Sequence, residues 1–397
     1  MKRKAEVVII GGGCMGASVA FHLTRCGVTD ILLLEREQFL GSCSTGRNAG
    51  GVRHQFSSEA NVRLSIESIR LFERFEEEVG SPIDFHQDGY LFLLSSDESV
   101  AAFRSGAEMQ RRLGVQVEWL APGDAARLAP GLEVSGVAAA TFCGRDGIAD
   151  PGGVTLAFAS AARAAGAEIA KATAATGIRV ERGRVRAVET TDGEVETPVV
   201  VNAAGAWAGE VGHMAGLDVP VSPLRRHIFI ASPPCVEGWK RRLPGGAIEE
   251  FAPASHIMVI DFDTSFYFHR EGANVLFGMG DPDERPGFDQ TVRWDFLPQV
   301  VEVAVRRLPA LAGAAVARAW AGLYEMTPDA MPLIGVAPGL EGFYVVAGFS
   351  GHGFQHSPAA GRILADLITV GDAGVDLAPF ALDRFGSDGA SGERHFV

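Results

Sequence analysis

The feature that most constrains this chain is the stretch of residues 6–35, where a short apolar run leads into a cluster of glycines. Residues 7–10 are four β-branched residues in a row, which is typical of a buried parallel strand. Three glycines follow in the spacing G-x-G-x-x-G: Gly11, Gly13 and Gly16. A helix-compatible segment then leads to a second apolar run, residues 31–34, which ends at Glu35. This order of strand, glycines, helix, strand and acid predicts a βαβ unit.

Each part of this unit has a function in a dinucleotide-binding site. The first glycine permits a tight turn, the second lets the backbone approach a pyrophosphate, and the third lets helix and strand pack closely. The N-terminus of the helix directs free N–H groups at the phosphates. A carboxylate at Glu35 can accept hydrogen bonds from ribose hydroxyls, and its charge disfavours the 2′-phosphate of NADP. The cofactor-binding candidates here are Gly11, Gly13, Cys14, Met15, Gly16, Glu35 and Arg36. The unit alone does not distinguish FAD from NAD.

Length, charge and cysteine usage exclude several classes of protein. A chain of 397 residues is too long for one ordinary core, so two domains are expected. The net charge of −14 argues against nucleic acid or an anionic membrane surface as a partner. No apolar run is long enough to predict a membrane span. The five cysteines are scattered without metal-binding or redox spacing, so we expect no metal site and a cytoplasmic location.

Glycine-rich turns after short apolar strands recur near residues 7, 200 and 345. Aromatic, strand-like segments lie between the last two of these places. The simplest architecture is one nucleotide-binding domain assembled from separate pieces, with a substrate domain inserted into it. Helices are expected at residues 14–26, 61–79, 96–113, 150–165, 296–308 and 358–368. The tail after Leu377 is expected to be loosely held.

Five motifs carry a resemblance to a known family: residues 11–35, 41–51, 201–207, 320–329 and 348–354. In this order they resemble FAD-dependent oxidoreductases of the D-amino-acid oxidase superfamily. Within it, the chain looks like sarcosine oxidase, glycine oxidase, dimethylglycine dehydrogenase and the catalytic subunit of archaeal proline dehydrogenases. The resemblance implies an α/β fold, in which a Rossmann-type FAD-binding domain carries an inserted α+β substrate domain on a mainly antiparallel sheet.

The domain boundaries that follow place residues 1–85, 145–220 and 325–385 in the FAD-binding domain. Residues 86–144 and 221–324 then form the substrate-binding domain. The resemblance implies that the loop before Gly51 runs along the cofactor and that the loop at 348–354 passes over the flavin ring. A helix starting near Pro358 would direct its dipole at the ring. The further cofactor-binding candidates are Ser44, Thr45, Asn48, Ala49, Gly50, Gly51, Ala203, Gly205, Trp207, Gly348, Gly351, His352, Gly353 and Phe354.

On the substrate side, Arg53 matches a position where sarcosine oxidases bind the substrate carboxylate, a task that suits the donor fork of a guanidinium. Tyr267 and Tyr324 resemble tyrosines near the amine, and either one is equally compatible with a core aromatic residue. His352 is expected to orient the backbone of the flavin loop. Gln355 stands where some sarcosine oxidases have a substrate-binding lysine.

Three departures from the relatives bear on the chemistry. Gly322 stands where monomeric sarcosine oxidases attach flavin through a cysteine, so the FAD is expected to be non-covalent. Those enzymes activate oxygen with a lysine, whose position falls near Leu276 in this chain. No lysine is present there, which leaves the identity of the electron acceptor open. No histidine lies near Asp150, where heterotetrameric relatives attach FMN.

The activity implied is oxidation of the C–N bond of a secondary or N-methyl amino acid, similar to sarcosine, glycine or proline. Hydride passes to flavin N5, and water hydrolyses the resulting imine. Two alternatives stay open. One is an FAD-dependent 2-hydroxy-acid or polyol-phosphate dehydrogenase with His352 or His269 as base. The other is an electron-relay or non-catalytic subunit. A homo-oligomer or a hetero-oligomeric dehydrogenase is compatible with each of these.

Overall fold

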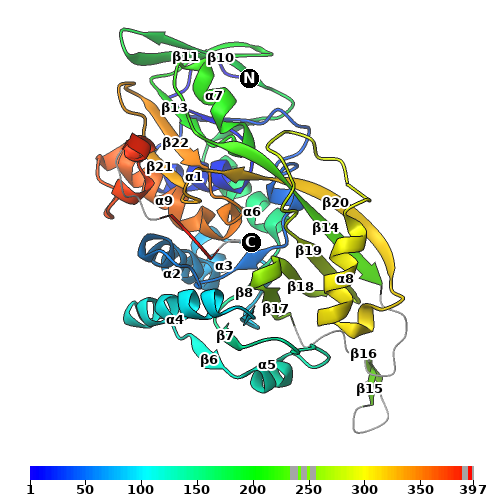
Figure 1. Ribbon diagram of the computed structural model, residues 1–397. Coiled ribbons are helices and arrows are strands. Elements are labelled where there is room, and N and C mark those ends of the chain that lie inside the picture. The colour runs from blue at the N-terminus through cyan, green and yellow to red at the C-terminus, as the bar shows by residue number, and fades with distance from the viewer. Residues whose placement is uncertain (233–239, 243–247, 251–255, 387–391, 396–397) are drawn as a thin grey trace.

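The structure is a computed structural model, and it describes residues 1–232, 240–242, 248–250, 256–386 and 392–395. A six-stranded sheet in the order β21-β22-β13-β1-β2-β9 forms one centre of the fold (Figure 1). Neighbouring strands are parallel except for β21 and β22. The strands are β1 (Val7–Ile10), β2 (Ile31–Leu34), β9 (Glu168–Ala170), β13 (Val199–Asn202), β21 (Leu333–Val336) and β22 (Phe343–Ala347). The three strand-to-glycine turns of the sequence therefore follow adjacent strands, β1, β13 and β22.

Helix α1 (Cys14–Arg25) connects β1 to β2 and packs against α6 (Pro151–Ala164) and α9 (Gly353–Val370). Small residues allow α1 and α9 to approach closely. A Cβ atom on Gly361 would lie 2.1 Å from Ser18 Oγ, which donates a hydrogen bond of 2.7 Å to Ser357 O. Asp150 begins α6, since its carboxylate accepts from the two N–H groups of the following glycines at 3.0 and 2.8 Å.

An eight-stranded sheet in the order β20-β14-β19-β18-β17-β5-β7-β6 forms the second centre. Every neighbouring pair is antiparallel except β17 and β5, which are parallel. The strands are β5 (Tyr90–Leu94), β6 (Glu118–Leu120), β7 (Ala139–Cys143), β14 (Ser222–Ser232), β17 (Met258–Asp261), β18 (Phe266–Glu271), β19 (Asn274–Met279) and β20 (Ala315–Met326). Its strands are rich in aromatic and β-branched residues, which suit a sheet buried on both faces.

The two faces of this sheet have different functions. One face packs on α5 (Pro122–Leu128) and α8 (Leu297–Arg307) through an apolar cluster that includes Phe229, Phe268 and Phe277. The buried ion pair between Arg307 Nε and Asp261 Oδ2, 2.6 Å long, joins α8 to the end of β17. The other face carries alternate residues of the same strands. They pack against Val100 and Phe103 of α4 (Asp97–Arg112) and line part of the cavity described in the next section.

Smaller elements complete the fold. A three-stranded sheet lies beyond the six-stranded one, and a second contains β3 just after the glycine loop at residue 50. These strands are β10 (Ala175–Glu181), β11 (Arg184–Thr190), β12 (Gly193–Glu196), β3 (Gly51–Val52), β8 (Gly147–Ala149) and β4 (Phe85–His86). The remaining helices of the described chain are α2 (Glu59–Glu73), α3 (Phe75–Val79), α4 (Asp97–Arg112) and α7 (Ala208–Met214). Among the described residues, no helix combines the length and apolarity needed to cross a membrane.

The expected fold class is confirmed, and two of the expected helices differ in the structure. The C-terminal helix begins at Gly353 rather than near Pro358. Proline inside a helix removes the N–H that would bond to the carbonyl four residues back, here Phe354 O. The hydroxyl of Ser357 donates to that carbonyl instead, at 2.8 Å, so the helix continues through the proline. The helix expected over 61–79 is also two helices, divided at Arg74.

The tail after Leu377 is not loosely held over its described part. Residues 378–380 and 382–386 form 3₁₀ turns. Residues 392–395 return to the body of the protein, where the side chains of Glu393 and His395 are 3% and 1% exposed. Hydrogen bonds to residues near the start of α2, described below, explain why this part of the tail is ordered.

Candidate active site

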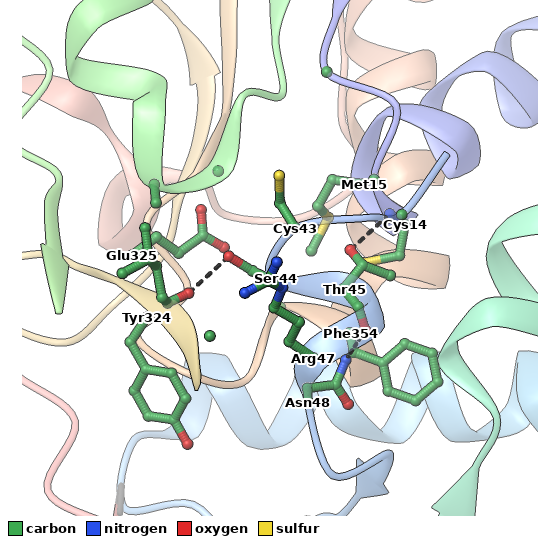
Figure 2. A pocket seen from close by; sticks show the side chains of 18 of the residues that line it. Cys14, Met15, Cys43, Ser44, Thr45, Arg47, Asn48, Tyr324, Glu325 and Phe354 are labelled. Carbon is green, nitrogen blue, oxygen red and sulfur yellow. Dashed lines mark hydrogen bonds between the residues drawn. The ribbon is translucent and has the colours of Figure 1, made fainter. Parts of the chain in front are cut away.

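One cavity joins the carboxyl ends of β1, β2 and β13 to the inner face of the eight-stranded sheet. Figure 2 shows some of the residues that line it. Nearly all residues chosen from the sequence line it, although they come from well-separated parts of the chain. Those that line it are Gly11, Gly13, Cys14, Met15, Glu35, Arg36, Ser44, Thr45, Asn48, Ala49, Gly51, Arg53, Ala203, Gly205, Trp207, Tyr267, Tyr324, Gly351, His352, Gly353, Phe354 and Gln355. Gly16, Gly50 and Gly348 lie behind the lining.

The turn after β1 has no room for side chains. Gly11 has a φ of +115°, and a Cβ atom there would lie 2.3 Å from Ala203 O in the turn after β13. A Cβ atom on Gly16 would lie 1.9 Å from Gly11 O, so this residue sets the approach of α1 to the turn. The glycine-containing turns after β1 and β13 therefore contact each other, and backbone atoms form this end of the cavity.

The N-terminus of α1 lies at the cavity. Its first turn has no acidic residue, and its N-cap residue, Gly13, has no side chain that could accept a hydrogen bond from the helix. Its dipole therefore favours an anion such as a pyrophosphate. Glu35 lies beside it and accepts hydrogen bonds from Gly12 N at 2.9 Å and Glu37 N at 2.8 Å. Burial raises the pKa of Glu35, and these two donors oppose that shift. Arg36 stacks over the ring of Trp207 at 3.7 Å.

The loop from Ser44 to Gly51 contains a 3₁₀ turn at Thr45–Arg47 and is held in place by its own polar groups. Ser44 Oγ donates to Leu323 O at 2.7 Å, which joins the loop to β20 (Figure 2). Asn48 Nδ2 donates to Thr45 O at 2.5 Å, and Asn48 Oδ1 accepts from Gly50 N at 2.6 Å. A Cβ atom on Gly51 would lie 1.6 Å from the hydroxyl oxygen of Tyr90, so only glycine fits between this loop and β5.

The other side of the cavity is formed by β20 and the N-terminus of α9. Glu325 and Tyr324 are neighbours on the strand, and their side chains point in opposite directions (Figure 2). Glu325 Oε2 accepts from Gly348 N at 3.0 Å. Burial raises the pKa of Glu325 to about 7, and the backbone donors of Gly348 and Phe349 oppose the shift. The first turn of α9 has no acidic residue of its own.

The raised pKa of Glu325 gives a testable pH dependence. A carboxyl group with a raised pKa in the folded state stabilises the fold most below its unfolded value, and loses that contribution as pH rises from about 4.5 to about 7. We expect the unfolding free energy of the apoprotein to fall by about 2–3 kcal/mol more in the wild type than in Glu325→Gln over this range. Denaturant unfolding at a series of pH values measures this difference. Parallel profiles for the two proteins would contradict the assignment.

Arg53 lines the cavity, but its guanidinium is already engaged. Nη1 donates to Gln55 O, and Nη2 donates to His395 O at 2.5 Å. Its cationic carbon lies 3.8 Å from the centre of the Phe56 ring, and only 6% of the residue is exposed. The side chain of Gln355 accepts from Arg53 N at 2.6 Å, so this glutamine positions the backbone at that point.

The aromatic and histidine candidates lie in apolar surroundings. Burial raises the pKa of both Tyr267 and Tyr324, so both phenols keep their protons at neutral pH and can donate hydrogen bonds. Burial and the charge of Arg53 lower the pKa of His352 to about 3. Neither ring nitrogen of His352 has a hydrogen-bond partner among the described residues. His269 does not line the cavity and bonds through Nδ1 to Arg270 O at 2.6 Å.

Several lining residues were missed in the sequence analysis. Arg226, Tyr90 and Glu325 lie in strands of the eight-stranded sheet, and Arg47 lies in the glycine loop. One signal was available for the first of these. Arg225 and Arg226 are adjacent in a strand, so their side chains must lie on opposite faces, and one of the two must face the interior of the molecule.

A buried cluster of possible metal ligands was also missed, since its members are far apart in sequence. His54, Cys143 and Asp146 place their donor atoms within 4.8 Å of one another. Hydrogen bonds explain the cluster without a metal. Asp146 Oδ1 accepts from both His54 N at 2.8 Å and His54 Nδ1 at 2.6 Å. Burial raises the pKa of the Cys143 thiol, which disfavours the thiolate that a metal would need.

These features fit FAD. The glycine-containing turns after β1 and β13 let the backbone approach the cofactor, and the N-terminus of α1 suits its pyrophosphate. Glu35 retains carboxylate lone pairs for a ribose, and the loop before Gly51 offers polar groups along another part of the cavity. The N-terminus of α9 and the loop at Gly351 would face the ring end, where they favour negative charge.

Comparisons with known proteins agree with this fit. The profile of the DAO family, described as FAD dependent oxidoreductase, matches residues 6–367. The solved L-proline dehydrogenase from P. horikoshii is 35% identical with a TM-score of 0.87, over 97% of this chain and 99% of that one. The glycine oxidase from Geobacillus kaustophilus is 27% identical with a TM-score of 0.83, over 96% and 99% of the two chains.

Among curated proteins, the mitochondrial dimethylglycine dehydrogenase of Rattus norvegicus is 31% identical over 97% of this chain. The matched region covers 45% of that protein, so this chain spans less than half the length of this relative. The family profile covers most of the chain. The glycine-containing turns of the chain, the N-termini of α1 and α9 and the polar loop before Gly51 all lie along one cavity. The chain therefore belongs to the DAO family of FAD-dependent oxidoreductases.

Proposed function

We propose that this protein oxidises the C–N bond of a secondary or N-methyl amino acid. The observation that carries the proposal is the composition of the cavity beyond the cofactor end. Two guanidiniums, of Arg53 and Arg226, and two protonated phenols, of Tyr267 and Tyr324, line it together. Cations and phenol donors suit a carboxylate, and the apolar remainder suits the small neutral body of such a substrate.

The chain's own residues bind, orient and desolvate the substrate. An arginine holds the carboxylate, and the phenols of Tyr267 and Tyr324 complete the polar end of the site. The inner face of the eight-stranded sheet, with Met258 and Ile260, excludes water above the reacting carbon. FAD held in this cavity would supply a two-electron acceptor for the hydride from that carbon. The amine loses a proton, and the imine product is hydrolysed by water.

The two histidines that could act as the base for a 2-hydroxy acid do not suit that role, so we propose an amine as the substrate. Oxidation of an alcohol needs a base for the hydroxyl proton. His352 has a pKa lowered to about 3, which makes it a weak base, and His269 lies outside the cavity. An amine that binds deprotonated needs no such group. No lysine lines the cavity in the described chain, and we propose that an acceptor other than O₂ reoxidises a non-covalent FAD.

Anaerobic reduction of the flavin tests the proposal. We expect sarcosine, N,N-dimethylglycine or L-proline to bleach the visible absorbance of the purified holoenzyme, whereas lactate and glycerol 3-phosphate leave it unchanged. In turnover assays, an artificial dye is expected to accept electrons faster than O₂, measured as dye reduction against hydrogen peroxide release. Acid precipitation should release the yellow cofactor. A flavin that no secondary amine reduces would remove the proposal.

Three further expectations remain proposals. The division at residues 86, 145, 221 and 325 is supported by the two sheets, whose strands fall largely on either side of it. A cytoplasmic location is supported by the cysteines in the described residues, none of which is in a disulfide, while Cys235 lies outside the described residues. An assembly with copies of itself or with other subunits fits a catalytic chain of this length.

A further inference from the structure

Arg226 projects from β14 into the cavity, while its neighbour Arg225 lies on the opposite face of the sheet. The two arginines differ in their partners. Arg225 forms ion pairs with Glu284 at 2.9 Å and Asp289 at 2.5 Å. Arg226 forms no ion pair with any carboxylate of the described chain, and its Nε is buried without a hydrogen-bond partner there. Its one hydrogen bond in that part of the chain is from Nη1 to Arg225 O, at 3.3 Å.

The other arginines of the cavity are satisfied by the protein. Arg36 pairs with Glu37 at 3.3 Å and stacks on an indole ring. Arg47 donates to Ala321 O at 2.8 Å. Arg53 gives both terminal nitrogens to backbone carbonyls. A half-buried cation without a counter-charge is unfavourable, because its desolvation is not compensated. An anionic ligand would provide the missing compensation for Arg226.

The surroundings of Arg226 suit the head group of such a ligand. Its guanidinium carbon lies 5.1 Å from the centre of the Tyr324 ring. The charge of Arg226 opposes the rise in pKa that burial causes at both Tyr267 and Tyr324, so it is close to both phenols. On the neighbouring chain segment, Gly280 has no side chain, and a Cβ atom there would lie 3.8 Å from the guanidinium carbon. One cation and two phenols thus surround the same space.

We propose that Arg226 binds the carboxylate of the substrate, and that Arg53 instead holds the cavity wall in place. This inference rests on the proposed function, because it assigns one part of the amino-acid substrate to one residue. The guanidinium fork of Arg226 donates to the two carboxylate oxygens, with a phenol as a third donor. The substrate amine and its oxidisable carbon are then directed from the sheet toward the flavin ring. The substrate class is an amino acid with a free carboxylate rather than a simple amine.

Binding of unreactive analogues to the holoenzyme tests the proposal without turnover. (Methylthio)acetate and pyrrole-2-carboxylate have the outlines of sarcosine and proline but no oxidisable amine, and (methylthio)acetamide is a neutral counterpart. Titration of the flavin absorbance spectrum gives each Kd. In Arg226→Gln we expect the Kd of the acids to rise about 100-fold, with the Kd of the amide unchanged. Arg226→Lys should recover part of the loss, because it keeps the charge but not the fork.

Arg318→Gln is the matched control, because it removes an exposed charge from β20 in the same sheet and outside the cavity. It should leave every Kd unchanged. Acid affinity within threefold of wild type in Arg226→Gln, or equal losses for acid and amide, would overturn the proposal. So would wild-type flavin that neither acid perturbs. If the acids bind through Arg226 but no amine reduces the flavin, the proposed function fails and the carboxylate assignment stands.

Discussion

Replacing Gly16 with alanine is expected to abolish FAD binding and to destabilise the fold by roughly 3 kcal/mol or more. The new Cβ atom would lie 1.9 Å from Gly11 O, and real contacts of this kind are never so short. Gly11 O belongs to the backbone that directly follows β1, and the Cβ atom is fixed by the backbone of α1, so neither can rotate away. Helix α1 must move outward, which displaces its N-terminus from the phosphate position. The purified variant should be colourless, with an unfolding midpoint well below that of the wild type.

The same substitution at Gly123 provides the control for this experiment. Gly123 lies in the first turn of α5, and a Cβ atom added there would meet no atom of the surrounding structure within 4 Å, so alanine fits without a clash. Gly123→Ala should bind FAD as the wild type does and unfold at the same denaturant concentration or slightly above it. A yellow, fully stable Gly16→Ala protein would show that α1 can shift without loss of the phosphate site.

Local sequence pattern was sufficient to predict the first βαβ unit of the cofactor half of the molecule. The β-branched run at residues 7–10, the glycine spacing and the acid at Glu35 each reflect a constraint within thirty residues of the same chain segment. Repeated strand-to-glycine turns also indicated which distant strands belong together, and these lie side by side as β1, β13 and β22. Helix boundaries were less accurate where a side chain replaced a missing backbone donor, as Ser357 does before Pro358.

The substrate half was harder to predict, because its contacts join residues that no local pattern relates. The sequence predicted Arg53 as a ligand of the substrate carboxylate, and Arg53 does line the cavity. The sequence could not reveal that Arg53 Nη2 donates to the carbonyl oxygen of His395, a residue 342 positions away. The role of Arg226 depends on which face of β14 meets the cavity, which is a property of the packed sheets. The fixed conformation of residues 392–395 likewise depends on hydrogen-bond partners near the start of α2, which are distant in the sequence.

Replacing Glu393 with glutamine is expected to lower the unfolding free energy by about 3 kcal/mol at neutral pH. The buried carboxylate accepts from Ser57 N at 2.8 Å, Ser57 Oγ at 2.5 Å and Asn61 Nδ2 at 3.0 Å, among other donors near the N-terminus of α2. An amide has one oxygen instead of two, and its NH₂ group would face these donors. His395 follows two residues later, so the loss should also release its contact with Arg53.

The pH dependence of this loss identifies its cause. Hydrogen bonds from Ser57 and the neighbouring charge of His395 lower the pKa of Glu393 to about 2, against the opposing effect of burial. A lowered carboxyl pKa stabilises the fold above the unfolded value near 4.5, and the contribution disappears as pH falls toward 2. The difference between wild type and Glu393→Gln in denaturant unfolding should therefore be full at pH 6 and shrink below pH 4.5. Glu341→Gln, which breaks an exposed ion pair with Arg184, should cost less than about 1 kcal/mol. A Glu393 effect as small as this control would mean that residues 392–395 contribute little to the fold, and that Arg53 keeps its position without them.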